Sequence, residues 1–303
     1  MATTPQGSIF VTGANGGLGS AIVDQIARTP DSGCELSRYD LVPLDLGSLA
    51  SVRAAGALPR LRALVLNAGW QEYTTQTRTA DGFDQAFQVN YLSHFLLTLL
   101  LLESLDRERG RVVVLGSWSH ETTDRRNTMG PTHGRRVHGR AVPADFCGPA
   151  HGHREGRHGE VELDGGTSGR ELSERIAADP ALSALTVVGV DPGAMPSNLI
   201  RDRGTPLLRF MADWLMPWLV PIMSWFQPNG NFRTTAQSAR DVLRAAGLFS
   251  GNDASANGTY FNGSVVGDVG PEAKDDVKCK TLWTDGVRFA EVQDGDTVLA
   301  DWR

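Results

Sequence analysis

A glycine-rich segment directly after a short apolar run restricts the fold of this chain more than any other feature. The apolar run at residues 9–11 is followed by Thr12-Gly-Ala-Asn-Gly-Gly-Leu-Gly19, which opens an amphipathic stretch. A strand, a glycine turn and a helix in this order bind the phosphates of a dinucleotide, with the helix N-terminus facing the anion. Gly13, Gly17 and Gly19 each relieve a different steric clash in such a turn. The alternative is a glycine-rich loop of any α/β protein.

Apolar runs of strand length alternate with helical segments along the chain. They lie at residues 9–11, 63–66, 112–115 and 185–190, with a weaker run at 259–261. This alternation predicts parallel strands joined by crossover helices. We therefore expect an α/β fold with a Rossmann-type, doubly wound parallel sheet in one domain. That domain is expected to span residues 1–270, with a C-terminal extension at 271–303.

Residues 81–103 predict a helix that is buried on most sides. Phe83, Phe87 and Tyr91 recur at four-residue spacing, and a nearly continuous apolar run follows at residues 95–102. A helix that is apolar around most of its circumference belongs in the interior of a domain.

Charge and cysteine usage exclude several classes of function. The net charge of −6 gives no reason to expect a nucleic-acid partner. The polar first seven residues lead into the first strand without an apolar signal region, which favours a cytoplasmic protein. Cys34, Cys147 and Cys279 lie far apart with no CxxC pair, so we expect neither a disulfide framework nor a metal site.

Further motifs follow the glycine segment in order, at the ends of the expected strands. They are Leu44-Asp-Leu46, Asn67-Ala-Gly69, Val89-Asn90, Val114-Leu-Gly-Ser117, and Pro192-Gly193 with Ser197. Over roughly residues 7–200 the chain resembles the short-chain dehydrogenase/reductases, in particular retinol-dehydrogenase-like, fungal-type members. The resemblance implies NADP or NAD as cofactor and a lipophilic alcohol or ketone as the small apolar substrate.

The resemblance also implies which residues meet the cofactor. Asp45 would contact the adenine, or it is a turn or helix-cap aspartate. Pro192-Gly193 would bend the chain around the nicotinamide, and Ser197 stands where a threonine often meets the carboxamide. The residues implied to bind the cofactor are Thr12, Gly13, Asn15, Gly17, Leu18, Gly19, Asp45, Asn67, Ala68, Gly69, Pro192, Gly193 and Ser197.

Ser117 and Asn90 are the expected catalytic residues. The Ser117 hydroxyl, at the end of a strand, can hydrogen-bond a substrate carbonyl and stabilise the charge that develops on its oxygen during hydride transfer. Ser119 is the fallback, and His120 is a less favoured proton donor. By resemblance Asn90 holds a proton-relay water, and the alternative is a satisfied core amide.

The Tyr-x-x-x-Lys pair on which the family's proton transfer depends is missing. No tyrosine lies between Tyr91 and Tyr260, and the first lysine is Lys274. Residues 130–169, where the pair belongs, hold ten glycines, five histidines and no apolar periodicity. We expect a flexible loop there, and its Gly-, Arg- and His-rich composition favours a shifted reading frame or a misplaced intron boundary. A metal site at Cys147, His151, His153 and His158 and a nucleic-acid-binding arm are weaker alternatives.

The sequence is also abridged before Asp45. Only fourteen residues separate Pro30 from Asp45, whereas a βαβ crossover alone needs at least about 10–12 residues. The segment that reads the ribose is therefore truncated. Arg38 weakly favours binding of a 2′-phosphate and hence NADP as the cofactor. The alternative is that Arg38 only faces solvent.

Residues 207–226 form an apolar segment with three tryptophans. Its uncharged core, 214–226, is too short to span a bilayer. An apolar substrate lid within residues 200–230 is the first interpretation. A contact with a second copy of the chain or with a membrane surface is the alternative. The chain is thus predicted to be an NAD(P)-dependent oxidoreductase, and the alternative is a catalytically silent dinucleotide-binding or interaction protein of the same fold.

Overall fold

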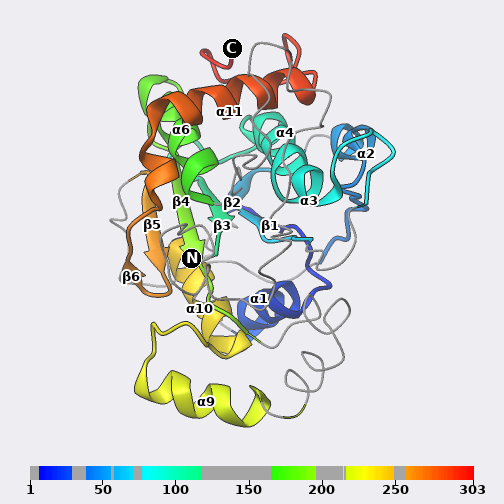
Figure 1. The fold of residues 1–303 in the computed structure, drawn as a ribbon. Helices are drawn as coiled ribbons and strands as arrows, with labels where there is room; N and C mark the ends of the chain where they lie inside the picture. The colour runs from blue at the N-terminus through cyan, green and yellow to red at the C-terminus, as the bar shows by residue number, and fades with distance from the viewer. Residues whose placement is uncertain are drawn as a thin grey trace, which may run out of the picture.

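The computed structural model of the chain describes eight parts of it. These are residues 7–28, 39–55, 58–70, 77–117, 165–195, 214, 216–248 and 257–303. Figure 1 shows a central sheet with helices on both sides.

Six strands form one sheet in the order in which they occur in the chain. The pairs from β1 to β5 are parallel, and β5 pairs with β6 antiparallel. The predicted parallel sheet is confirmed, and the short β6 was not predicted. The strands are β1 (Ser8–Val11), β2 (Leu61–Leu66), β3 (Arg111–Leu115), β4 (Thr186–Asp191), β5 (Thr259–Asn262) and β6 (Val265–Val266).

Strand β1 forms one edge of the described sheet. Its hydrogen-bonded neighbour is β2, and none of the described residues forms a strand on its other side. A doubly wound sheet continues past its first strand with further βα units. Residues 39–45, the described part of the stretch predicted to be abridged, contain neither helix nor strand.

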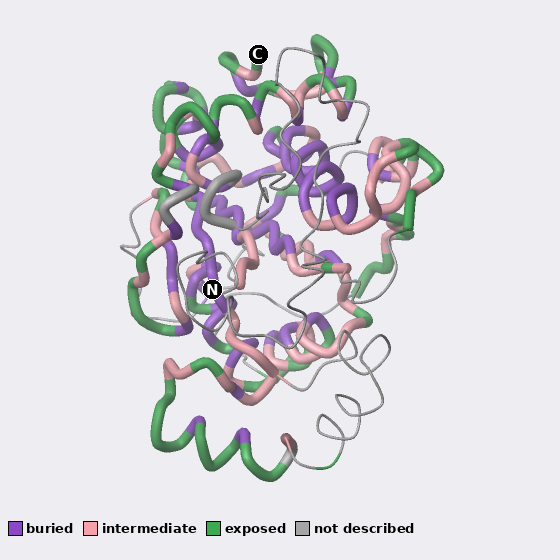
Figure 2. The backbone as a smooth tube through the Cα atoms, in the orientation of Figure 1, coloured by how far each residue is buried: buried purple, intermediate pink, exposed green. Residues whose placement is uncertain are grey.

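Alternate side chains of the strands face two separate core layers. Leu64 and Leu66 of β2 pack in one cluster, and Ala63 and Val65 pack in the other. The first layer is covered by α2 (Leu49–Ala54), α4 (Ser93–Leu101), α6 (Gly165–Ala178) and α11 (Asp276–Phe289). The second is covered by α1 (Gly17–Arg28) and α10 (Thr235–Ala245). Figure 2 shows that the strands of the sheet and α4, on one side of it, are largely buried.

The helix predicted over residues 81–103 is present and buried, with an interruption that was not predicted. It consists of α3 (Gln85–Phe87), a π-helical turn η2 (Gln88–Leu92) and α4. Asp84 caps its N-terminus by accepting a hydrogen bond from the Phe87 N–H. A π turn adds one residue to the helical repeat and is frequent at functional sites. Here the turn contains Asn90.

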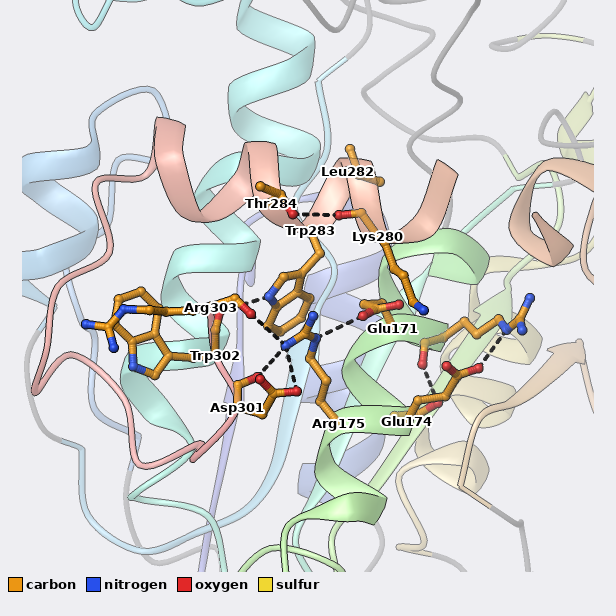
Figure 3. A network of polar contacts seen from close by, with 12 residues as sticks. Glu171, Glu174, Arg175, Lys280, Leu282, Trp283, Thr284, Asp301, Trp302 and Arg303 are labelled. Carbon is orange, nitrogen blue, oxygen red and sulfur yellow. Dashed lines mark hydrogen bonds and ion pairs between the residues drawn. The ribbon is translucent and has the colours of Figure 1, made fainter. Parts of the chain in front are cut away.

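Residues 271–303, predicted as an extension, pack against the same core as the rest of the chain. Trp283 of α11 is buried, meets Phe95 edge-to-face at 5.0 Å, and lies 4.5 Å from the Arg175 guanidinium. Its indole N–H donates to the Trp302 carbonyl at 2.9 Å. Arg175 of α6 also contacts Glu171 and the Asp301 side chain (Figure 3). These contacts connect α6, α11 and the last described residues.

Helix α6 includes the last residues of the predicted loop. The predicted loop ended at Gly169, but residues 165–169 are helical, so that end of the prediction is wrong. Leu172 and Ile176 on the same helix are buried in the core, and this packing outweighs the low helix propensity of its three glycines. The rest of the predicted loop, 130–164, lies outside the described residues.

Helix α9 (Met216–Phe226) exposes most of its large apolar side chains. Val220 and Ser224 are buried, whereas six large apolar side chains of the helix are exposed: Trp218, Leu219, Ile222, Met223, Trp225 and Phe226. The helix lies beside α10 at one end of the molecule (Figure 1) and is green over most of its length in Figure 2. Among the described helices, none is long and apolar enough to cross a membrane.

Candidate functional site

The turn between β1 and α1 has the tight geometry that its glycines predict. Gly13 adopts φ +66°, a left-handed backbone conformation that favours glycine. A Cβ on Gly19 would lie 2.1 Å from the Gly13 carbonyl oxygen, so helix and turn could not approach each other with any other residue there. Gly17 is the first residue of α1. The N-terminus of α1 thus follows the turn directly. Free backbone N–H groups at such a helix N-terminus can bind a phosphate group.

Thr12 joins this turn to the end of β2. Its hydroxyl accepts hydrogen bonds from the backbone N–H groups of Asn67 (2.9 Å) and Ala68 (3.0 Å). The Asn67 side-chain amide donates to the Thr12 carbonyl at 2.8 Å. The Asn67 amide therefore holds the strand end rather than pointing freely at a ligand. The predicted cofactor residues on these two strands are brought together.

Asn90 fixes the loop that follows Gly69. Its side-chain oxygen accepts from the Trp70 N–H at 2.7 Å, and its side-chain nitrogen donates to the Trp70 carbonyl at 3.0 Å. This pairing agrees with the alternative prediction that Asn90 is a core amide with its hydrogen bonds satisfied. It also ties the helix that carries Asn90 to the loop after β2. The proton-relay role stays a prediction.

Asp45 lies at the start of a turn that leads into α2. Its carboxylate accepts from the Gly47 N–H at 2.8 Å, and its own N–H donates to the Ser51 hydroxyl at 2.9 Å. The N-cap of α2 is Ser48. The side chain is exposed and serves as a turn aspartate, one of its two predicted roles. The adenine contact stays a prediction.

Ser117 lies just past the end of β3, in the neighbourhood of the end of β4. The N–H of Gly116 donates to the Val190 carbonyl at 2.8 Å, which continues the pairing of the two strands beyond Leu115. Ser117 is half-buried. Its hydroxyl thus belongs to the same edge of the sheet as Thr12 and Asn67, as the predicted site requires.

The predicted nicotinamide segment is held by Arg233, a residue that was not predicted to belong to the site. This fully buried side chain donates to the Asp191 carbonyl at 2.6 Å, to the Asn229 carbonyl at 3.2 Å and to the Asn262 side-chain oxygen. Burial lowers the pKa of Arg233. Gly193, at φ +73°, leaves room for it, since a Cβ there would lie 3.2 Å from the Arg233 side chain.

His94 is the second residue that sequence reasoning missed. It is buried on α4, and its ring lies 3.0 Å from the Thr12 hydroxyl and 3.3 Å from the Asn90 carbonyl. A histidine within an otherwise apolar helix was the available signal. Burial lowers its pKa from 6.5 to about 4, against a smaller raising effect of the Asn90 carbonyl.

Several predicted positions lie outside the described residues. They are Ser197, the fallback Ser119, His120, Arg38 and the alternative metal-site residues Cys147, His151, His153 and His158. Within the described parts of the chain, no three His, Cys, Asp or Glu side chains cluster closely enough to hold a metal ion.

A parallel α/β sheet with a glycine turn at its first strand defines a dinucleotide-binding protein of the Rossmann type. Comparisons with known proteins specify the family. The family described as short chain dehydrogenase matches residues 35–125. A short-chain dehydrogenase from Talaromyces variabilis, iccH, is 43% identical, and the alignment covers 98% of this chain and 99% of that protein. The chain belongs to the short-chain dehydrogenase/reductase family of NAD(P)-dependent oxidoreductases.

More distant proteins agree with this assignment. Human retinol dehydrogenase 13 is 28% identical over 96% of this chain and 87% of that protein. The solved structure of NADPH-bound carbonyl reductase from chicken fatty liver has the same fold. It superimposes with a TM-score of 0.52 at 17% identity, covering 86% of this chain and 99% of that one.

The alignment with the Talaromyces protein is longer than this chain. It runs over 367 positions, more than the 303 residues of this chain. The relative therefore has residues opposite gaps in this chain. Where the shortened segments lie stays a prediction.

Proposed function

We propose that residues 12–19 bind the pyrophosphate of NADP(H) or NAD(H) at the N-terminus of α1. The observation that carries this proposal is the contact between Gly19 and the Gly13 carbonyl, which a side chain would abolish. Backbone N–H groups at a helix N-terminus attract phosphate oxygens. Asn15 lies in the same turn, and Leu18 lies in the first turn of α1. Arg38 supports NADP over NAD, and one protein of the same fold is the carbonyl reductase described as NADPH-bound.

The nicotinamide end is proposed to lie at the carboxyl ends of β2, β3 and β4. Asn67, Ala68 and Gly69 line one side, and Pro192-Gly193, held by Arg233, lines the other. Ser197 follows that segment. Ser117 is proposed to donate a hydrogen bond to the substrate oxygen, so that its hydroxyl stabilises the charge that hydride transfer creates. When bound, the dinucleotide supplies or accepts the hydride.

The proposed substrate is a lipophilic alcohol or ketone. Several relatives are named for such substrates, among them retinol dehydrogenase 13 and a mouse polyprenol dehydrogenase. The apolar side chains of α9, within the proposed lid at 200–230, supply a surface for such a molecule. Contact with a second copy of the chain or a membrane surface is the alternative use of this exposed helix.

A catalytically silent dinucleotide-binding or interaction protein is the second candidate. The observation that favours it is the absence of any tyrosine between Tyr91 and Tyr260 and of any lysine before Lys274. A positioned general acid is typically worth about 10²–10⁴-fold in rate. Ser117 has a pKa far above neutrality and supplies a proton poorly. The two candidates share cofactor binding and differ in turnover.

Cofactor binding is tested by calorimetry with NADPH and with NADH. Gly17→Val places a β-branched side chain at the start of α1, in the phosphate path, and should abolish binding. Ser20→Val introduces the same side chain at an exposed position on the same helix and should leave binding unchanged. Equal affinities in wild type and Gly17→Val would remove the glycine turn from the site. Tighter binding of NADPH than of NADH would support the role of Arg38.

A further inference from the structure

His94 is a buried titratable side chain that has no role in the proposed cofactor binding or in the proposed reaction at Ser117. It is 6% exposed in the apolar helix α4. Its two ring nitrogens face different parts of the site. Nε2 lies 3.0 Å from the hydroxyl of Thr12, which is distant in sequence, and Nδ1 lies 3.3 Å from the carbonyl of Asn90 on the same helix. A buried polar ring requires partners for both nitrogens.

The hydrogen bonds around Thr12 determine which ring nitrogen carries the proton. The Thr12 hydroxyl already accepts from two backbone N–H groups, those of Asn67 and Ala68. A hydroxyl has two acceptor lone pairs and one proton to donate. Its proton therefore goes to His94 Nε2 at 3.0 Å rather than to the Val65 carbonyl at 3.5 Å. Nε2 is an acceptor, so the ring is neutral and Nδ1 donates to Asn90.

We propose that His94 is a positioning residue that couples the dinucleotide turn to the Asn90 backbone. The inference rests on the proposed cofactor binding, because Thr12 begins the glycine turn. A neutral imidazole both accepts from Thr12 and donates to Asn90, and it crosses the space between β1 and the π-helical turn η2. The ring thereby fixes the position of the glycine turn relative to the Asn90 carbonyl.

Two amide substitutions separate the two hydrogen bonds. In His94→Gln the side-chain amide lies near the position of Nε2, so it can still accept from Thr12 but loses the donor to Asn90. In His94→Asn the amide lies near the position of Nδ1, so it can still donate to Asn90 but does not reach Thr12. Thr98→Val is the matched control, since Thr98 is buried one turn further along α4 and its hydroxyl bonds to the His94 carbonyl within the helix.

The first readout is the affinity for NADPH, measured by fluorescence titration. Loss of one hydrogen bond should raise Kd about 5-fold in His94→Gln and in His94→Asn, and loss of both in His94→Ala about 20-fold. Thr98→Val should keep the wild-type Kd. Unchanged affinity in His94→Ala would overturn the coupling. Wild-type protein that binds no dinucleotide would instead refute the proposed function.

The second readout needs no cofactor and separates these two failures. Long-range ¹H–¹⁵N NMR of protein with labelled histidine identifies the tautomer of each ring, and the His94 signal is the one absent from His94→Gln. We expect a neutral ring with the proton on Nδ1 at pH 7. A proton on Nε2 would overturn the proposal, because the Thr12 hydroxyl would then have no acceptor in the ring. Circular dichroism verifies that each variant is folded.

Discussion

Protonation of His94 should make the stability of the fold depend on pH. The ring is neutral in the folded chain, with its pKa lowered to about 4 by burial, whereas in the unfolded chain it titrates near 6.5. As the pH falls below 6.5, the unfolded state binds a proton that the folded state does not, so stability decreases. The decrease ends near pH 4, where the folded ring is protonated as well. One pKa unit corresponds to about 1.4 kcal/mol, so the full effect is about 3 kcal/mol.

The perturbation that isolates this effect is His94→Gln, which removes the titrating group. Free energies of unfolding are measured by urea denaturation from pH 7.5 to pH 4 at fixed ionic strength. The other titrating groups are common to both proteins and cancel in the difference. Wild type should lose about 2 kcal/mol relative to the variant between pH 7 and pH 5, and about 3 kcal/mol by pH 4. A difference that stays constant over this range would refute a buried, neutral His94.

Two further substitutions test the supports of the site by urea denaturation. Trp283→Ala should lower the free energy of unfolding by about 3–5 kcal/mol, because the indole is buried against Phe95 and hydrogen-bonded to Trp302. Trp283→Phe keeps an aromatic ring and should lower it less. Equal losses in the two variants would argue against a packing role of the ring. Arg233→Met should lower the free energy of unfolding by about 1–3 kcal/mol, because the Asp191 carbonyl and the Asn262 side-chain oxygen lose this buried donor; an unchanged transition would show that Arg233 does not hold the segment.

Local sequence patterns were sufficient for the sheet and for the glycine turn. The strands were predictable because apolar runs and their connections repeat, and alternate residues of β2 do face opposite core layers. Gly13 and Gly19 were predictable because their requirement is steric and arises within the turn itself. The sequence also indicated the buried helix that carries Asn90.

Contacts between distant residues could not be predicted in this way. The His94–Thr12 hydrogen bond joins residues 82 positions apart and depends on the register between η2 and the strand ends. Arg233 is one of many arginines in the chain, and its neighbours in sequence give no sign that it is buried. The helical residues 165–169 were expected to form a loop because of their glycines, and packing of α6 on the sheet overrode that preference.

The anchoring of α6 indicates that a catalytic helix can be restored to this chain. Leu172 and Ile176 bury one face of α6 in the core, and Arg175 joins it to residues 301 and 303. We therefore expect that residues 130–164 can be replaced by the corresponding segment of an intact relative that carries Tyr-x-x-x-Lys. Because the tyrosine would supply the missing proton, NAD(P)H-dependent reduction of an apolar ketone should rise about 10²–10⁴-fold above that of the unmodified chain, monitored by NAD(P)H absorbance.

Ser117→Ala in the grafted protein should remove the regained activity, because the hydroxyl that stabilises the substrate oxygen is lost. The same substitution should leave NADPH affinity unchanged, which distinguishes a catalytic defect from a binding defect. Robust ketone reduction by the unmodified 303-residue chain that also survives His120→Ala would contradict the reasoning. A proton donor other than the tyrosine would then have to reach the substrate. The absence of Tyr-x-x-x-Lys would no longer support the catalytically silent alternative.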